Sequence, residues 1–246
     1  MYLIHKQGGY FNSISKMVEE VLGEPCKHTS NPNETGTWVL FFTSFLSGFY
    51  KAIKGDYIVV QTEPLERTFN RYPEYKIMCE NATKVLDYSK NFEIRYSNNY
   101  RVEYEESKEI DVLFYGVLSP RRKEILDKIS VPNKVILHTS PPVVGADLWK
   151  LINNSKIVLL VNTHDSSQEF DWIRLTPLLS NKVFVIMEKN ADEKYDYLTK
   201  HIAMGHYDYI PTLIKHFLKN PLGRAQWSDK GFDYIRQHKT KIIEND

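Results

Sequence analysis

The chain has 246 residues, of which 42% are hydrophobic and 26% charged, a composition typical of a globular protein. This composition excludes a disordered chain or a fibre, and the length allows one large domain or two small ones. The 32 lysine and arginine residues nearly balance the 31 aspartate and glutamate residues, so no net basic field attracts nucleic acid or an anionic membrane surface. We therefore expect no nucleic-acid partner.

Neither the cysteines nor the apolar runs indicate a special compartment. Cys26 and Cys79 are far apart and belong to no metal-binding or disulfide pattern. The longest apolar run, at 39–46, is interrupted by Thr43 and Ser44, so it is too short to span a membrane. We expect a cytoplasmic protein without a signal peptide, a membrane span or a metal site.

Short, nearly continuous apolar runs recur along the chain and predict strands that are buried on both faces. These strands are expected at 38–42, 57–61, 111–115, 134–137, 156–161 and 182–187. Apolar residues at helical spacing lie between them, from Pro73 through Leu86, at 120–129 and at 209–218. Strand, helix and strand in alternation predict βαβ units and an α/β fold with a parallel sheet.

The polar stretch at 98–109 is the best candidate for a domain boundary, because it holds an acidic cluster and no strand pattern. A solvated loop would have the same composition. We expect an N-terminal domain at 1–105 and a C-terminal domain at 106–246. Two such domains facing each other enclose a cleft, which is the usual location of small-molecule sites.

The segment 111–123 predicts an anion site. It reads as a strand, then Gly116, then a helix with Ser119 as N-cap and Pro120 at the first helical position. No G-x-G-x-x-G motif is present, which disfavours an NAD-dependent oxidoreductase.

Three cations, Arg121, Arg122 and Lys123, follow in the first turn of this helix. They lie at the positive end of the helix dipole, where an exposed cation is unfavourable unless an anion is bound. Helix N–H groups and guanidinium groups together predict a phosphate or diphosphate site. The alternative is that the three side chains extend into water.

A second polar segment follows the strand at 156–161, where open α/β sheets bind ligands. Further on, Asp171 and Arg174 lie three residues apart on one helical face, with Glu169 nearby. A carboxylate here can accept hydroxyls of a sugar or ribose while Arg174 faces a phosphate. The alternative is a capped helix with an ordinary surface ion pair. Pro177 is expected to kink or break this helix.

In the first half, Gln61 and Glu63 lie at the end of a buried strand, and Asp87 lies near the end of the predicted helix. A carboxylate at either place could act as a general base toward a hydroxyl. The alternative is that both carboxylates cap local structure.

These segments resemble the two-domain glycosyltransferases of the GT-B class, and in particular a compact bacterial and viral group. The resemblance depends on the order of the segments over residues 57–188 rather than on any one motif. The segments that carry it are 58–65, 85–89, 111–116, 121–123, 155–159, 170–174, 178–180 and 183–188.

The resemblance implies two Rossmann-like domains, the first one reduced, with a cleft between them. It implies that the second domain holds most of a nucleotide-sugar donor and that the acceptor approaches from the first. It also implies a C-terminal helix at about 221–239 that crosses back to the first domain. The expected protein is a glycosyltransferase that moves a sugar from a nucleoside-diphosphate sugar to a hydroxyl of a glycan or other acceptor. No cofactor and no obligatory metal is expected.

The residues expected to bind the donor and the acceptor lie in both halves of the chain. Residues for the donor diphosphate are Gly116, Ser119, Arg121, Arg122, Lys123 and Arg174. Residues for the donor sugar or ribose are Thr163, His164, Glu169 and Asp171, and Thr139 is expected at the nucleobase. The resemblance points Glu63 toward the cleft as the base, and the acceptor is expected beside Gln61, Asp87 and Tyr88. The alternative function is a non-catalytic module that binds a nucleotide sugar or phosphosugar.

Overall fold

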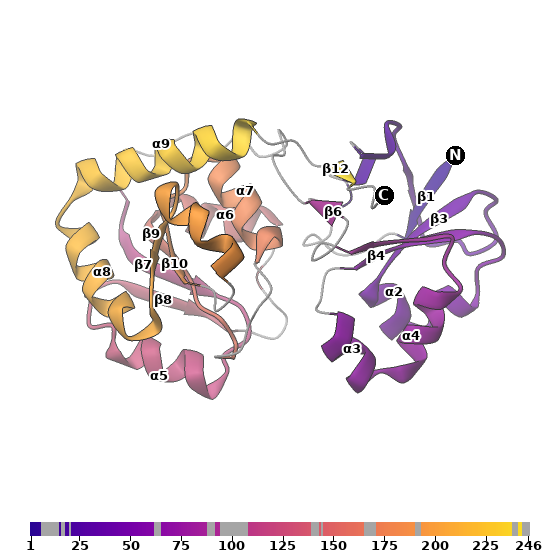
Figure 1. Ribbon diagram of the computed structural model, residues 1–246, viewed down its shortest axis with the longest axis horizontal. Coiled ribbons are helices and arrows are strands. Elements are labelled where there is room, and N and C mark those ends of the chain that lie inside the picture. Colours follow the sequence, from indigo (N-terminus) through magenta and orange to yellow (C-terminus); the bar gives the residue numbers. More distant parts are fainter. Residues whose placement is uncertain are drawn as a thin grey trace. The chain divides into compact units, whose positions relative to one another are not determined.

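The computed structural model describes residues 1–5, 15, 18–19, 21–61, 65–87, 92–93, 108–138, 143, 145–164, 171–189, 193–237 and 241–242. The chain divides into two compact units (Figure 1). One unit comprises Met1–Ser97 together with Lys239–Asp246, and the other comprises Asn98–His238.

The first unit contains a parallel sheet of five strands in the order β2-β1-β3-β4-β5. The strands are β1 (Tyr2–His5), β2 (Lys27–Thr29), β3 (Thr37–Phe41), β4 (Tyr57–Gln61) and β5 (Lys84–Asp87). β3 and β4 are buried along nearly their whole length, as their unbroken apolar runs predict.

Aromatic side chains dominate the core of the first unit. One face of the sheet is covered by α2 (Phe42–Leu46), the 3-10 helix η1 (Phe49–Lys51), α3 (Leu65–Arg71) and α4 (Pro73–Glu80) (Figure 1). Trp38 and Leu40 of β3 are fully buried here against Tyr75 and Met78 of α4. Alternate residues of a strand point to opposite faces, so Trp38 and Leu40 meet the same helices.

The second unit contains a parallel sheet of five strands in the order β11-β10-β9-β7-β8. The strands are β7 (Ile110–Tyr115), β8 (Lys134–Leu137), β9 (Ser155–Leu160), β10 (Val185–Glu188) and β11 (Ala203–Gly205). β7, β9 and β10 are almost entirely buried, whereas β8 is only half-buried because it is an edge strand.

Helices cover both faces of this second sheet. The helical elements are α5 (Pro120–Lys128), α6 (Gly145–Asn153), α7 (Trp172–Ser180), η2 (Glu193–Lys200), η3 (Tyr207–Tyr209), α8 (Ile210–Leu218) and α9 (Pro221–Gln237). Phe114 of β7 and Leu159 of β9 lie in one core with α5 and α8. α6 packs against β7 and β9, and α9 packs against α7 and α8. In the described residues, no helix is long and apolar enough to cross a membrane.

After α9 the chain returns to the first unit. There β12 (Lys241–Ile242) pairs antiparallel with β6 (Phe92–Glu93), with Lys241 opposite Glu93 and Ile242 opposite Phe92. The predicted C-terminal helix at about 221–239 corresponds to α9, which lies in the second unit.

The predicted α/β class with two Rossmann-like units is confirmed. In each unit the strands follow the order second, first, third, fourth, fifth, one of the common arrangements of doubly wound parallel sheets. Of the predicted strands, 57–61 and 134–137 are correct to the residue, and the others are shifted at one or both ends.

The long helix predicted from Pro73 to Leu86 is wrong in its second half. α4 ends at Glu80, and Asn81 caps it, so Val85 and Leu86 belong to β5. The backbone N–H of Thr83 donates to the carbonyl of Tyr57, which turns the chain into the sheet. Asp87 therefore ends a strand, not a helix.

Of the kink or break predicted at Pro177, the break does not occur, because α7 continues through this residue to Ser180. Proline costs a helix one N–H donor in its interior. Buried packing on both sides offsets that loss, since Thr176 is fully buried and Leu178 is 1% exposed.

Candidate functional site

The carboxyl ends of β7 and β9 meet at the topological switch point of the second sheet. From β7 the chain passes to β8 on one side and then to β9 on the other. Doubly wound sheets bind ligands in the crevice at such a point. Gly116 follows β7, and Asn162, Thr163 and His164 follow β9, so most predicted donor residues that the structure describes converge there.

Gly116 and Ser119 shape the turn between β7 and α5. Gly116 has φ +131°, which a residue with a side chain rarely adopts, and a Cβ placed there would lie 3.2 Å from Nη1 of Arg174. Ser119 is the N-cap of α5, as predicted: its Oγ accepts from the N–H of Arg122 at 3.2 Å. The same hydroxyl donates to the carbonyl of Thr163 at 3.2 Å, which ties α5 to the end of β9.

Arg121 is held by a buried carboxylate. Its guanidinium donates twice to Glu188, from Nη2 to Oε1 at 2.6 Å and from Nη1 to Oε2 at 2.8 Å. The ring of Tyr207 lies 3.9 Å from the guanidinium carbon, and the Tyr207 hydroxyl donates to the backbone carbonyl of Arg121. Glu188 also accepts from the N–H of Asn162 at 2.8 Å. This cluster therefore joins α5, β9, β10 and η3.

Arg122 points into the protein. Its Nε donates to the carbonyl of Val161 at 2.8 Å and its Nη1 to the carbonyl of Val117 at 2.9 Å. The residue is 5% exposed, and burial, together with the nearby Arg174, lowers the pKa of its guanidinium to about 10. The group is still cationic at neutral pH, so it places a buried positive charge beside Gly116.

Lys123 behaves differently from the two arginines. Its ammonium is exposed and pairs with Asp127, one turn further along α5, at 2.6 Å. The idea that the three cations extend into water is therefore correct for Lys123 and wrong for Arg121 and Arg122.

Arg174 completes the group of cations at the switch point. Its guanidinium forms an ion pair with the carboxylate of Asp171, the N-cap of α7, and its Nη1 donates to the carbonyl of Tyr115 at 3.1 Å. Asp171 also accepts from the backbone N–H of Arg174. The predicted proximity of Asp171 and Arg174 is confirmed, and burial raises the pKa of the adjoining Tyr115 hydroxyl.

At the corresponding edge of the first sheet, Gln61 and Asp87 lie side by side. They are opposite each other in the register of β4 and β5, and they are 0% and 3% exposed. Oε1 of Gln61 accepts from the hydroxyl of Tyr75 at 2.5 Å. Two buried polar side chains thus end adjacent strands of the first unit.

Four of the predicted residues cannot be placed in this geometry. Glu63, Tyr88, Thr139 and Glu169 lie outside the described residues. His164 is described and exposed. No cluster of three or more His, Cys, Asp or Glu side chains that could hold a metal ion occurs within the described ranges.

Sequence reasoning assigned no role to Glu188 or Tyr207. Glu188 lies 67 residues from Arg121, so no local spacing reveals their pairing. One sequence signal does point to a role for Glu188: it is a carboxylate at the end of a buried apolar strand.

The two parallel-sheet units match the GT-B fold, as predicted. Among solved structures, the chain is similar to the β-glucosyltransferase of T4 phage. A structure that addresses its substrate binding and proposed catalytic mechanism superposes with a TM-score of 0.55 at 12% identity. Its complexes with UDP-glucose and with UDP and Mn²⁺ give 0.57 and 0.59 at 11% identity.

Each comparison covers 96% of this chain and 94% of the phage enzyme. No protein-family model and no curated protein sequence matches the chain. At this level of identity the similarity establishes the fold, and function must be argued from the site.

Proposed function

We propose that this protein is a glycosyltransferase that moves a sugar from a nucleoside-diphosphate sugar to a hydroxyl of a glycan or other acceptor. The observation that carries the proposal is the group of cations around Gly116, at the switch point of a fold shared with an enzyme solved with UDP-glucose. The second unit is the donor unit in this proposal, and the first is the acceptor unit.

In this proposal, the donor diphosphate is bound mainly by positive charge. The backbone N–H groups of Gly116, Leu118 and Arg122 already donate within the protein. The net positive charge at the switch point therefore comes from the guanidinium of Arg122 and the positive end of the α5 dipole, because Asp171 pairs with Arg174 as Glu188 does with Arg121. Arg121 is neutralised by Glu188, so in this proposal it orients the start of α5 rather than adding net charge.

In the transfer step, an acceptor hydroxyl oxygen forms a bond to the anomeric carbon while the bond from that carbon to the diphosphate oxygen breaks. The electron pair leaves with the diphosphate, and the arginines stabilise its added charge. The hydroxyl proton passes to a carboxylate. Glu63 is the base suggested by the resemblance, and Asp87 is the carboxylate that the structure describes at the edge of the acceptor unit.

The proposal includes no obligatory metal, although one structure of the phage enzyme contains Mn²⁺ with UDP. In the described residues of the second unit, the carboxylates of Asp171 and Glu188 each face an arginine. These two carboxylates fit the orientation of arginines better than the binding of a divalent cation. Transfer measured in EDTA and again with added Mn²⁺ tests this part of the proposal.

A thermal-shift panel tests donor binding. UDP-, GDP-, dTDP- and CMP-sugars are added to the full chain without metal, because a ligand that binds only the native state raises the melting temperature. We expect one nucleotide class to stabilise the protein and Arg174→Gln to abolish the shift. Arg236→Gln, an exposed arginine on α9, is the matched control and should keep it.

Donor turnover with an acceptor then separates the two candidate functions. Binding without transfer under any acceptor condition would favour the non-catalytic binding module. An unchanged melting temperature with every nucleotide sugar would contradict the transferase and favour the binding module with a phosphosugar as its ligand. Asp87→Asn and Glu63→Gln identify the base, since the correct one should lose transfer and keep donor binding.

A further inference from the structure

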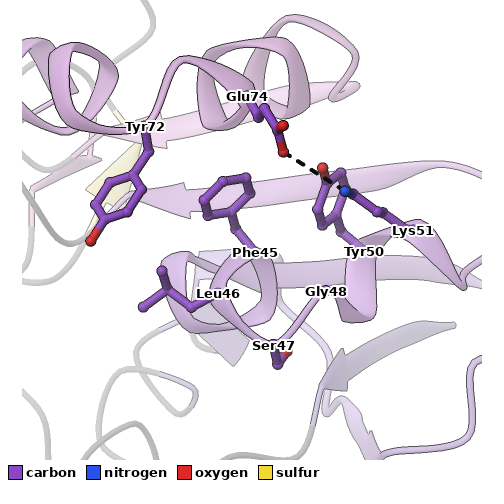
Figure 2. A pocket seen from close by; sticks show the side chains of 8 residues that line it. All are labelled: Phe45, Leu46, Ser47, Gly48, Tyr50, Lys51, Tyr72 and Glu74. Atoms are coloured by element: carbon purple, nitrogen blue, oxygen red, sulfur yellow. Dashed lines mark ion pairs between the residues drawn. The ribbon is translucent and has the colours of Figure 1, made fainter.

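The first unit holds a pocket that the donor and acceptor residues above do not use. Its volume is about 360 Å³, within the range of small-molecule sites. It lies between the end of α2, η1 and the start of α4 (Figure 2). The residues that line it are Phe45, Leu46, Ser47, Gly48, Tyr50, Lys51, Tyr72 and Glu74.

Three aromatic rings form the apolar part of this pocket. Figure 2 shows Phe45 between Tyr72 and Tyr50, and the ring centroids of these two lie 6.0 and 5.6 Å from that of Phe45. All three side chains are half-buried, so part of each ring remains accessible. Such rings offer flat apolar faces to a ligand.

A buried residue, Tyr75, fixes the position of the aromatic part of the pocket. The ring of Phe45 packs edge-on against the fully buried Tyr75 at 5.2 Å. The Tyr75 hydroxyl in turn donates to Gln61, at the carboxyl end of β4. A preformed site loses little conformational entropy when a ligand binds. Only the side chain of Tyr75 therefore separates Phe45 of the pocket from Gln61, a predicted acceptor residue.

The rim of the pocket carries one cation and one anion. Lys51 Nζ and Glu74 Oε2 lie 3.7 Å apart, beyond hydrogen-bond distance, and the two side chains are 64% and 72% exposed. An exposed pair of this kind contributes little to stability, so its opening costs little. Lys51 can then donate to a ligand oxygen and Glu74 can accept from a ligand hydroxyl.

This combination selects a particular chemistry. A ligand that uses both parts of the pocket has an apolar face for the aromatic rings and, at its edge, neutral groups that accept from Lys51 and donate to Glu74. A pyranose ring has an apolar face of C–H groups and a circumference of hydroxyls, which matches both parts of the pocket. We propose that the pocket binds a neutral sugar ring of the acceptor glycan, an inference that rests on the proposed transferase function.

Equilibrium binding to the full chain in the absence of nucleotide tests this inference. Maltotriose, cellotriose and chitotriose serve as probes, and saturation-transfer NMR reports which of them the protein contacts. We expect at least one to bind, with affinity about tenfold weaker in Glu74→Ala and in Lys51→Ala. The matched controls are Glu80→Ala and Lys76→Ala, which remove an equally exposed ion pair of 3.7 Å from the same helix, α4.

Absence of binding by all three trisaccharides at millimolar concentration would overturn the inference. Equal affinity in Glu74→Ala and Glu80→Ala would also overturn it, as would binding of phenol in place of every sugar. The thermal shift with nucleotide sugars separates this test from that of the proposed function. Trisaccharide binding that depends on Glu74, without any effect of a nucleotide sugar, would retain the pocket and refute the transferase.

Discussion

Arg121 and Arg122 are neighbours in the chain, and the fold uses their guanidinium groups in different ways. Arg121 pairs with the carboxylate of Glu188, packs on an aromatic ring and also donates to the carbonyl of Asn162, whereas the hydrogen bonds of Arg122 run to the carbonyls of Val117 and Val161. One therefore contributes almost no net charge to the switch point, and the other contributes a full one. The positive potential expected at the start of α5 therefore comes mainly from Arg122, because Asp171 pairs with Arg174.

The Arg121–Glu188 pair should be important for stability. Removing one partner of a buried ion pair leaves the other charge without compensation. We expect Arg121→Met to lower the free energy of unfolding by about 3 kcal/mol, measured by urea denaturation. Lys123→Met, which removes an exposed pair with Asp127, should change it by less than about 1 kcal/mol. Equal effects of the two substitutions would contradict the structural role of Glu188.

His5 should make the first unit sensitive to acid. Its ring stacks on Phe49 with a centroid distance of 3.7 Å, and Ser44 Oγ lies 3.0 Å from its Nδ1. Burial lowers the pKa of His5 below its usual value of 6.5, so the folded chain binds this proton less readily than the unfolded chain. The contribution to stability is complete above pH 6.5 and is lost as the pH falls through the lower folded pKa.

We therefore expect the free energy of unfolding to decrease between about pH 7 and pH 5, with a smaller decrease in His5→Phe. Phenylalanine retains the stacking on Phe49 and does not titrate. Urea denaturation at a series of pH values measures both slopes. An identical slope in the variant would show that other groups cause the acid sensitivity.

At the scale of elements, α5 is the part of the site that local sequence rules explain best. Ser119 caps the helix, Pro120 occupies its first position, and Ile125 and Leu126 are fully buried on its inner face. The same serine hydroxyl contacts the carbonyl after β9. The cap thus links the start of a helix to the adjacent strand at the switch point.

Substitution of Ser119 should separate stability from donor binding. We expect Ser119→Ala to lower the free energy of unfolding by about 1 kcal/mol, and Ser119→Asp to restore the cap. The added carboxylate at the positive end of α5 should nevertheless repel a diphosphate. Melting temperatures with and without the nucleotide sugar measure both effects. A nucleotide-induced shift in Ser119→Asp equal to that of the unmodified chain would place the diphosphate elsewhere.

The sequence predicts elements well where burial is continuous and poorly where it is not. β7 and β9 are found because their apolar runs lie in the centre of a sheet. β2 is not predicted from the sequence, because it is an edge strand of three residues, two of them exposed. β5 is mistaken for helix because Val85 and Leu86 continue the helical spacing of Tyr75 and Met78.

The candidate site shows the same division. The residues contributed by α5 are predictable, since a cap, a proline and a glycine act over a few positions. The partners of these residues are not, because Glu188 and Tyr207 reach Arg121 only through the order of the strands and helices in space. Sequence spacing contains no information on that order.

At the scale of the whole molecule, the two units have separate hydrophobic cores. The core of the first unit centres on Trp38 and Tyr75, and that of the second on Phe114 and Ile214. Each unit thus has its own source of stability. A ligand of one unit should act first on that unit.

Hydrogen exchange should reveal this division. If a UDP-sugar is the donor, we expect it to slow amide exchange in α5 and at the ends of β7 and β9, and to leave β3 and β4 unchanged. Mass spectrometry of peptides after short labelling times measures the exchange. The free sugar at the same concentration is the control. Protection confined to the first unit would reverse the assignment of donor and acceptor units.

The short ladder between β6 and β12 has a consequence for the order in which the protein is built. Residues Asn98–His238 form an insertion within the first unit, which is completed by Lys239–Asp246. Because β12 follows the second unit in sequence, the first unit cannot close this ladder until synthesis has passed Ile242. The second unit is continuous in sequence, so all of it is synthesised before β12. The unit that begins first is therefore finished last.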